Sequence, residues 1–166
     1  MYKIEFSEFE YGDIPINKKR ELEHNIAYSM LDRMLCECGI CEYEILKNEN
    51  GKPYLKDNSI HFNISHTNGF CAVCINDSPV GLDCEKIDHS FKDRIPQFAK
   101  RYFLETELEL LKKTEYDTLT FFKIWTRKEA YIKKFGYNAS YITKVDTTKE
   151  DIETIVHGEY IISIFK

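Results

Sequence analysis

Apolar and polar residues recur along the first half of the chain in a pattern that predicts one long helix among short strands. Alternation over residues 2–6 predicts a strand. Apolar residues at helical spacing predict a helix from Asn17 to Cys38, which Asn17 can cap and Gly39 can end. Turn residues then separate three apolar segments. The strands predicted from them cover residues 60–64, 70–75 and 80–85.

The second half repeats this order of a helix followed by strands. Helical patterning begins after Ile87, and the spacing of Thr106 and Glu109 resembles a capping box. A longer helix is predicted over residues 118–135, with Gly136 at its end. Three more strands are predicted over residues 141–145, 152–156 and 160–165. The segment near Ile87 is therefore the predicted joint between two subdomains, residues 1–87 and 88–166.

The composition favours a folded chain of one ordinary domain or two small half-domains. The 166 residues are 43% hydrophobic and 31% charged, which excludes disorder of the whole chain. No window reaches the run of about 18 apolar residues that a membrane helix requires, and no secretory hydrophobic segment follows the charged start. We therefore expect a cytoplasmic protein without a membrane-spanning helix.

The charge is acidic on average but basic in two places. A formal net charge of −5 argues against a general nucleic-acid binder, which needs a basic surface. Basic residues nevertheless gather over residues 92–101 and 123–134. These segments either bind an acidic partner or a phosphorylated ligand, or form ordinary solvated helix faces.

Six cysteines suggest a zinc site or disulfides, because Cys36, Cys38 and Cys41 are close together and Cys71 precedes Cys74 by three positions. A strand over the second group would point its two thiols to opposite faces, whereas a zinc knuckle needs a tight turn. We therefore predict reduced, buried thiols. A cysteine-rich zinc-binding interaction module is the alternative interpretation.

Two carboxylates are predicted on one face of the strand over residues 80–85. Asp83 and Glu85 would lie about 7 Å apart on that face, within reach of one hard cation. Gly81 lies on the same face and leaves room for a ligand or a backbone to come close. An amphipathic strand with one solvated face is the alternative.

Glu129 falls inside the apolar stripe of the helix predicted over residues 118–135. A carboxylate buried there without a partner would cost several kcal/mol, roughly. With Asp83 and Glu85 it would complete the oxygen-only ligand set that Mg²⁺ accepts, and Lys133, one turn later, could neutralise a phosphate beside the ion. An ion pair of Glu129 with Lys128 or Lys133 is the alternative.

Lys52, Ser65 and His66 form a third candidate group. All three can donate hydrogen bonds to phosphate oxygens from loops near strand ends. Ser65 and His66 are adjacent, so their side chains diverge on an extended backbone and do not form a nucleophile and its base. His66 as an ordinary polar turn residue is the alternative.

Four segments, taken together, resemble the signature of a known enzyme family. They are Gly51-Lys52-Pro53, Phe62-Asn63-Ile64-Ser65-His66, Val80-Gly81-Leu82-Asp83-Cys84-Glu85 and Trp125-Thr126-Arg127-Lys128-Glu129-Ala130-Tyr131-Ile132-Lys133. In order and spacing they resemble 4′-phosphopantetheinyl transferases of the larger, Sfp-like group. Four motifs in order, among them W-x-x-K-E-x-x-x-K, are highly specific.

The resemblance implies transfer of the phosphopantetheine arm of coenzyme A to a serine of an apo acyl or peptidyl carrier protein, with release of adenosine 3′,5′-bisphosphate. It also implies an α+β fold of two similar subdomains in a pseudo-twofold arrangement, each an antiparallel sheet packed with a long helix. We expect a monomer that acts in lipid or secondary-metabolite biosynthesis and binds neither nucleic acid nor membrane.

The resemblance assigns roles to individual residues as well. The implied Mg²⁺ ligands are Asp83, Glu85 and Glu129. The implied coenzyme A contacts are Lys52, Pro53, Ser65, His66, Asp83 and Lys133. Among them, Lys52, Ser65 and His66 would chiefly hold the 3′-phosphate, and Lys133 would meet the pyrophosphate. Glu107 matches a further family acid, so either Glu129 or Glu107 would accept the proton of the carrier serine.

The chain departs from the family pattern in two respects. The stretch from His24 to Ala27 lacks a clear match to the basic and hydroxyl residues with which the N-terminal helix of this group helps to bind the nucleotide. The chain is also short for the group. A catalytically degenerate member that binds a carrier or coenzyme A without turnover is therefore a further interpretation.

Overall fold

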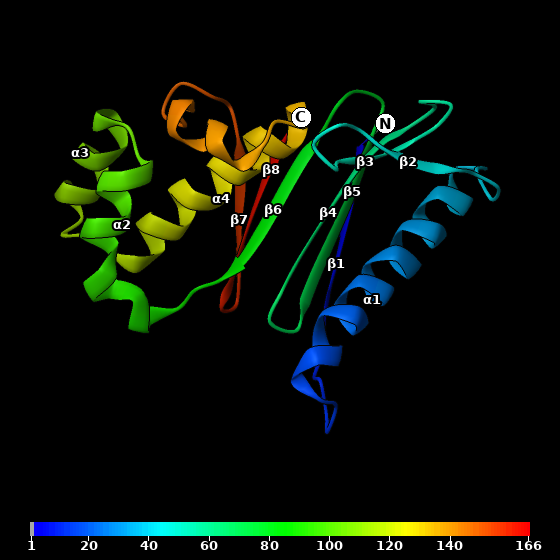
Figure 1. The fold of residues 1–166 in the computed structure, drawn as a ribbon, viewed down its shortest axis with the longest axis horizontal. Helices are drawn as coiled ribbons and strands as arrows, with labels where there is room; N and C mark the ends of the chain where they lie inside the picture. The colour runs from blue at the N-terminus through cyan, green and yellow to red at the C-terminus, as the bar shows by residue number, and fades with distance from the viewer. Residues whose placement is uncertain (1) are drawn as a thin grey trace.

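The computed structural model describes residues 2–166 and has an α+β fold (Figure 1). The first half contains five strands and one long helix. In chain order these are β1 (Tyr2–Glu8), α1 (Ile16–Glu37), β2 (Ile45–Lys47), β3 (Pro53–Leu55), β4 (His61–Thr67) and β5 (Phe70–Asn76). Helix α1 and strands β1, β4 and β5 confirm the helix and the three strands predicted for these parts of the chain.

The second half contains three strands, and α4 is the longest of its helices. Its elements are β6 (Gly81–Lys86), the 3₁₀ helix η1 (His89–Arg94), α2 (Ile95–Tyr102), α3 (Glu105–Lys113), α4 (Thr118–Phe135), the 3₁₀ helix η2 (Ala139–Lys144), β7 (Glu153–His157) and β8 (Tyr160–Phe165). The predicted helix over residues 118–135 and the strands over β6, β7 and β8 are confirmed.

The two halves share one sheet topology. The first sheet has the strand order β1-β5-β4 and the second has the order β6-β8-β7, and all of these neighbours are antiparallel. In both sheets the last strand of the half is central, and the first strand pairs with it. Helix α1 packs against the first sheet and α4 against the second, on opposite sides of the molecule (Figure 1). Strand β6 therefore pairs within the second sheet, and the division of the chain into residues 1–87 and 88–166 stays a prediction.

Two apolar clusters hold the first half together and join it to the second. One lies beneath α1, where Leu31 and Leu35 are fully buried against β4 and β5. The other lies between the two sheets and includes Phe70, Leu82 and Ile162. Each such side chain contributes about 1.5–3 kcal/mol through burial of apolar surface. The two sheets therefore pack against each other through a shared apolar cluster.

Side chains of β4 join the edge of the first sheet to the edge of the second. Asn63 Oδ1 accepts a hydrogen bond from the backbone N–H of Leu82 at 2.7 Å, and Ser65 Oγ accepts one from Cys84 at 3.2 Å. These bonds satisfy backbone donors on the outer edge of β6, where no strand is paired in the described chain. They bring β4 and β6 side by side in the middle of the molecule (Figure 1).

The structure corrects two predicted helix starts. Asn17 is not the cap of α1, because the helix begins at Ile16 and Pro15 occupies the cap position. The predicted capping box of Thr106 and Glu109 is also wrong. The cap of α3 is Leu104, two residues before Thr106, and Glu107 Oε2 accepts a hydrogen bond at 2.9 Å from the N–H of Leu104.

The strand predicted over residues 141–145 is wrong as well. The segment forms η2, whose first turn is set by Asn138 Oδ1 accepting from the N–H of Ser140 at 3.1 Å. The carbonyl oxygens of Ile142 and Val145 both accept from the ammonium of Lys128. These bonds take up the acceptors that a strand would present to a neighbouring strand.

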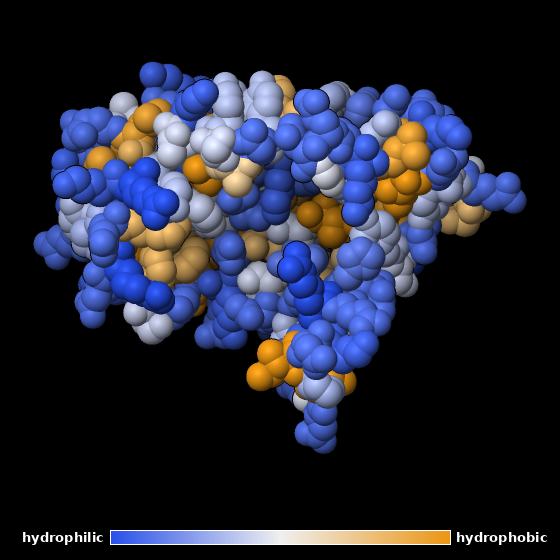
Figure 2. Space-filling model, viewed as in Figure 1, coloured by the Kyte–Doolittle hydropathy of each residue, from blue (hydrophilic) through white to orange (hydrophobic). Residues whose placement is uncertain are grey.

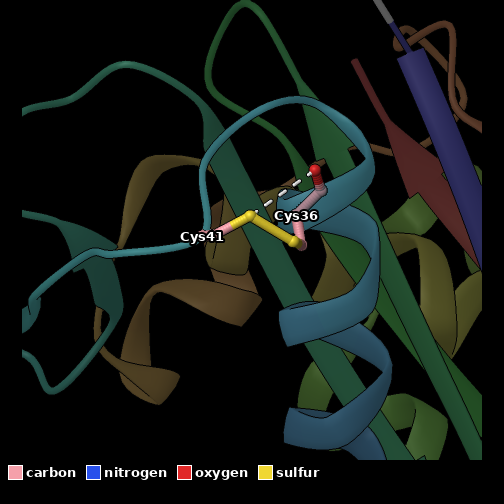
Figure 3. The surroundings of a disulfide bond; sticks show 2 residues. All are labelled: Cys36 and Cys41. Carbon is pink, nitrogen blue, oxygen red and sulfur yellow. Dashed lines mark hydrogen bonds between the residues drawn. A yellow bond between two sulfur atoms is a disulfide. The ribbon is translucent and has the colours of Figure 1, made fainter.

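Two of the cysteines predicted to be reduced form a disulfide, Cys36 with Cys41 (Figure 3). Gly39 ends α1 with a φ of +86°, and the N–H groups of Gly39 and Ile40 bond back to the helix at 2.9 and 3.0 Å. This reversal brings Cys41 back to the last turn of α1, which sequence spacing alone did not indicate. Cys71, Cys74 and Cys84 are buried thiols, as predicted.

The surface is largely polar on the face that Figure 2 shows. One hydrophobic area lies at the tip where the chain enters α1, and Ile16 in this segment is 84% exposed. Across residues 2–166, no helix has both the length and the apolar character needed to cross a membrane.

Candidate functional site

The candidate site lies where α4 crosses β6. Gly81 permits this approach, because a Cβ at this position would collide with the carbonyl oxygen of Ala130 in α4. The close approach to a backbone predicted for Gly81 is confirmed. It places Asp83, two residues along the strand, beneath Lys133 of α4.

Asp83 is the centre of a buried polar network and is only 4% exposed. Its Oδ1 accepts from Lys133 Nζ at 2.6 Å and from Ser65 Oγ at 3.0 Å, and Lys133 also donates to Ser65 at 3.1 Å. Its Oδ2 is buried and has no hydrogen-bond partner among residues 2–166. One oxygen of this carboxylate is therefore satisfied, while the other lacks the donor or cation that a buried anion requires.

Glu85 and Glu129 are electrostatically coupled to Asp83. Burial, followed by repulsion from Asp83, raises the pKa of Glu85 to about 7, and Glu129 adds to the rise. The same two causes, in the same order, raise the pKa of Glu129 to about 7. Lys133 opposes both shifts, and Thr67 Oγ1 donates to Glu85 at 3.3 Å. The three predicted ligands thus form one cluster of mutually repelling carboxylates.

This cluster suits a hard divalent cation in its donor atoms. It offers only carboxylate oxygens, which Mg²⁺ prefers, and the buried Oδ2 of Asp83 has an open acceptor position. The geometry is not that of a formed metal centre, since no three His, Cys, Asp or Glu side chains of the described chain are placed to hold a metal ion together. Binding of one ion by all three would require the carboxylates to move closer together.

The placement of the cysteines contradicts the alternative interpretation as a zinc-binding module. Cys71 and Cys74 belong to different apolar clusters on opposite faces of β5, as the strand prediction requires. Cys36 and Cys41 are joined to each other in the disulfide. Over the part of the chain that the structure describes, the cysteines therefore form no zinc cluster.

Lys52 lies at the joint between the β2–β3 hairpin and the second half. Its ammonium donates to the carbonyl oxygens of Val80 at 3.1 Å and Lys134 at 2.8 Å. Burial lowers the pKa of Lys52 to about 8. Pro53, the next residue, pairs with Lys47 in the hairpin. The structure thus gives Lys52 a bridging contact that the sequence did not indicate, and its contact with phosphate stays a prediction.

Ser65 and His66 lie within β4 and not on the predicted loop, because the strand extends to Thr67. Their side chains have different partners, as expected for adjacent residues of an extended backbone. Ser65 is 5% exposed, and its hydroxyl donates one bond and accepts two, which uses its full capacity. His66 Nδ1 lies 2.9 Å from Glu23 Oε2. Ser65 therefore organises the carboxylate network, and His66 has an acidic partner from α1.

The structure does not bring Glu107 to the carboxylate cluster. Glu107 and Lys128 are both fully buried and pair at 2.8 Å. The second oxygen of Glu107 accepts from the N–H and hydroxyl of Thr147 at 3.0 and 2.8 Å. With both oxygens bonded and no exposure, Glu107 has a structural role here, and this geometry speaks against the predicted role as base for the carrier serine.

Sequence reasoning missed two residues that shape the site and the partner of a third residue, Lys128. Asn63 and Thr67 act with Ser65 from one face of β4, where they reach the backbone of β6 and Glu85. The alternation of polar residues at positions 63, 65 and 67 was a detectable signal for this face. Lys128 was considered only as a partner for Glu129, and nothing local indicated its pairing with Glu107.

Comparison with known proteins shows the family to which the chain belongs. A family profile described as the 4′-phosphopantetheinyl transferase superfamily matches residues 79–165, which is more than half of the chain. The chain belongs to the 4′-phosphopantetheinyl transferase superfamily. The match includes β6 and α4, the two elements that carry Asp83, Glu85, Glu129 and Lys133.

Curated relatives agree with this assignment. The 4′-phosphopantetheinyl transferase gsp of Aneurinibacillus migulanus is 40% identical over 92 residues, covering 54% of this chain and 37% of the relative. The transferase Sfp of Bacillus subtilis (strain 168) is 36% identical over 95 residues, covering 55% and 41%. The transferase AcpT of Escherichia coli (strain K12) is 31% identical over 123 residues, covering 69% and 60%. In all three comparisons this chain covers less than two thirds of the relative's length.

Proposed function

We propose that the protein transfers the 4′-phosphopantetheine arm of coenzyme A to a serine of an apo acyl or peptidyl carrier protein, releasing adenosine 3′,5′-bisphosphate. The observation that carries this proposal is the buried network of Asp83, Ser65 and Lys133 beside Glu85 and Glu129. The relatives bear the name of this activity.

Asp83, Glu85 and Glu129 would hold Mg²⁺ at this site. When bound, the ion would neutralise negative charge on the pyrophosphate of coenzyme A. The open oxygen of Asp83 and the mutual repulsion of the three carboxylates both favour a cation there. A cation would also relieve the cost of burying them.

Lys133 and Glu129 would act on the reacting groups. The ammonium of Lys133 is held by Asp83 at one end of α4, where it can donate to a phosphate oxygen. Without a bound cation, burial and repulsion from Asp83 raise the pKa of Glu129 to about 7, and its carboxylate would accept the proton of the carrier serine. Of the two candidate bases, we assign this role to Glu129, because Glu107 is fully buried.

Lys52, Pro53 and His66 would contact coenzyme A, and basic residues of α2 would meet the acidic carrier. Lys100 and Arg101 lie in the last turn of α2, where they are available to complement negative charge on a partner. The action as a monomer and the cytoplasmic location are parts of the same proposal.

The direct test is to incubate the protein with coenzyme A, Mg²⁺ and a panel of apo carrier proteins, and to measure the mass of each carrier. We expect at least one carrier to gain the mass of the phosphopantetheine arm, and omission of Mg²⁺ to prevent the gain. Binding of coenzyme A without any gain across the panel would instead identify a degenerate member of the family.

A further inference from the structure

A buried carboxylate outside the metal cluster has no role in the chemistry described so far. Glu23, in the second turn of α1, is 7% exposed. Its Oε2 lies 2.9 Å from His66 Nδ1. Its Oε1 accepts from the hydroxyl of Tyr11 and from the N–H of Gly69 at 3.3 Å. Glu23 thus meets donors from the N-terminal loop, from β4 and from the β4–β5 turn.

These contacts determine which nitrogen of His66 carries hydrogen. A carboxylate can only accept, so Nδ1 must hold the hydrogen in the Glu23 pair. The other ring nitrogen, Nε2, points away from Glu23 by the geometry of the ring, and the His66 side chain keeps 25% of its surface exposed. A second hydrogen, on Nε2, would let this nitrogen donate to a phosphate oxygen from a ring that carries positive charge.

Without that cation, Glu23 would disfavour any anionic ligand nearby. The donors from Tyr11 and Gly69 are neutral, so they leave the negative charge of Glu23 in place. A protonated His66 cancels this charge and turns an N–H toward the solvent side. The stretch His24 to Ala27, one residue further along α1, lacks a clear basic residue of the kind expected for the nucleotide. His66 paired with Glu23 would supply that positive charge.

We infer that Glu23 is a positioning residue that holds His66 with its Nδ1–H on the carboxylate and so presents a positively charged Nε2–H to a phosphate monoester. This inference rests on the proposed function and takes the 3′-phosphate of coenzyme A as the ligand. Glu23 touches neither the reacting phosphate nor the metal cluster and acts only through His66.

A purely structural role for Glu23 makes a different prediction. Glu23 also fastens the loop of Tyr11 to the turn at Gly69, so its removal could loosen the N-terminal segment. Tyr11→Phe is the matched control, because it removes one hydrogen bond to Glu23 and leaves the pair with His66 intact. If Glu23 only holds the Tyr11 loop against the Gly69 turn, Tyr11→Phe and Glu23→Gln should weaken coenzyme A binding to a similar extent.

The experiment measures dissociation constants of coenzyme A and of 3′-dephospho-coenzyme A by calorimetry. In Glu23→Gln we expect coenzyme A to bind about five- to tenfold more weakly, the ratio for a charge-assisted hydrogen bond that becomes a neutral one, with little change for the dephospho form. Tyr11→Phe should retain the wild-type preference for coenzyme A. In a protein that already carries His66→Gln, the added change Glu23→Gln should cause no further loss of affinity for coenzyme A.

Nitrogen NMR of the imidazole supplies a readout that does not depend on ligand. The wild type should carry hydrogen at Nδ1 of His66, and Glu23→Gln should shift the ring toward the Nε2–H tautomer. A wild-type ring with hydrogen only at Nε2, or an unchanged preference for coenzyme A in Glu23→Gln, would overturn the role of Glu23. Failure of the wild type to bind either nucleotide would refute the proposed function together with the ligand assigned to His66.

Discussion

Lys133 holds its ammonium 2.6 Å from Asp83 Oδ1, although the two residues are 50 positions apart in the sequence. The contact ties the last turns of α4 to β6, and Ser65 extends it to β4 of the other sheet. The joint between the two halves and the candidate site are therefore the same set of side chains. A change at this joint can be expected to alter the proposed chemistry.

Glu129→Gln should lower the rate of transfer by about 10²–10⁴-fold, the usual contribution of a general base. It should not destabilise the fold, because it removes a charge that repels Asp83. Single-turnover rates with a responsive carrier and a thermal melt test both expectations. Glu109→Gln, an exposed position of α3, is the control. A wild-type rate in Glu129→Gln would refute its assignment as ligand and base.

Mg²⁺ should raise the melting temperature of the wild-type protein, because a ligand that binds only the folded state stabilises it by mass action. Asp83→Asn should lose this rise, since the open carboxylate oxygen becomes part of a neutral amide. The comparison needs equal ionic strength, with a monovalent salt in place of Mg²⁺. An equal rise in both proteins would place the ion elsewhere.

Gly81→Ala should abolish transfer and destabilise the fold by about 1–3 kcal/mol, the usual cost of overpacking. The added methyl group collides with the Ala130 carbonyl and pushes α4 away from β6. Gly158→Ala is the comparison. Its added Cβ would meet nothing within 4 Å, so its only cost is the backbone strain of an alanine at a φ of +57°. Urea unfolding and transfer rates should separate the two variants, and retained transfer in Gly81→Ala would contradict the geometry.

Lys52 should make stability depend on alkaline pH. Burial lowers its folded pKa from 10.5 to about 8, so between these values the unfolded chain binds more protons at this residue. The free energy of unfolding should therefore rise with pH across this window, by about 1–2 kcal/mol after allowance for solvent screening. The wild type should gain this amount relative to Lys52→Met between pH 8 and 10.5 in urea titrations. Parallel curves would contradict the burial of a charged Lys52.

Glu107→Gln should destabilise the fold by about 3–5 kcal/mol, because it leaves the ammonium of Lys128 buried without its counter-ion. Transfer per folded molecule, measured at low temperature, should persist if Glu107 is structural. The double variant Glu107→Leu with Lys128→Met should recover much of the lost stability. Loss of transfer in a folded Glu107→Gln protein would restore Glu107 as a candidate base.

Periodic patterns in the chain were sufficient to locate most elements of the fold. The helix over residues 118–135 was predicted with the bounds that α4 has, and α1 differs from its prediction by one residue at each end. The placement of Gly81, Asp83 and Glu85 on one strand face was also available in advance. These features depend on the repeat of the backbone itself, 3.6 residues in a helix and two in a strand, which is local to each segment.

Only the tertiary structure decided which partner each buried polar group has. Lys128 pairs with Glu107 rather than with Glu129, and Glu23 pairs with His66, 43 positions away. The segment at residues 141–145 is a 3₁₀ turn because Lys128 takes its carbonyl oxygens. A buried charge must find its counter-charge or donors among whatever the packing brings near. That neighbourhood depends on how whole elements meet in space, so no repeat along a single segment reveals it.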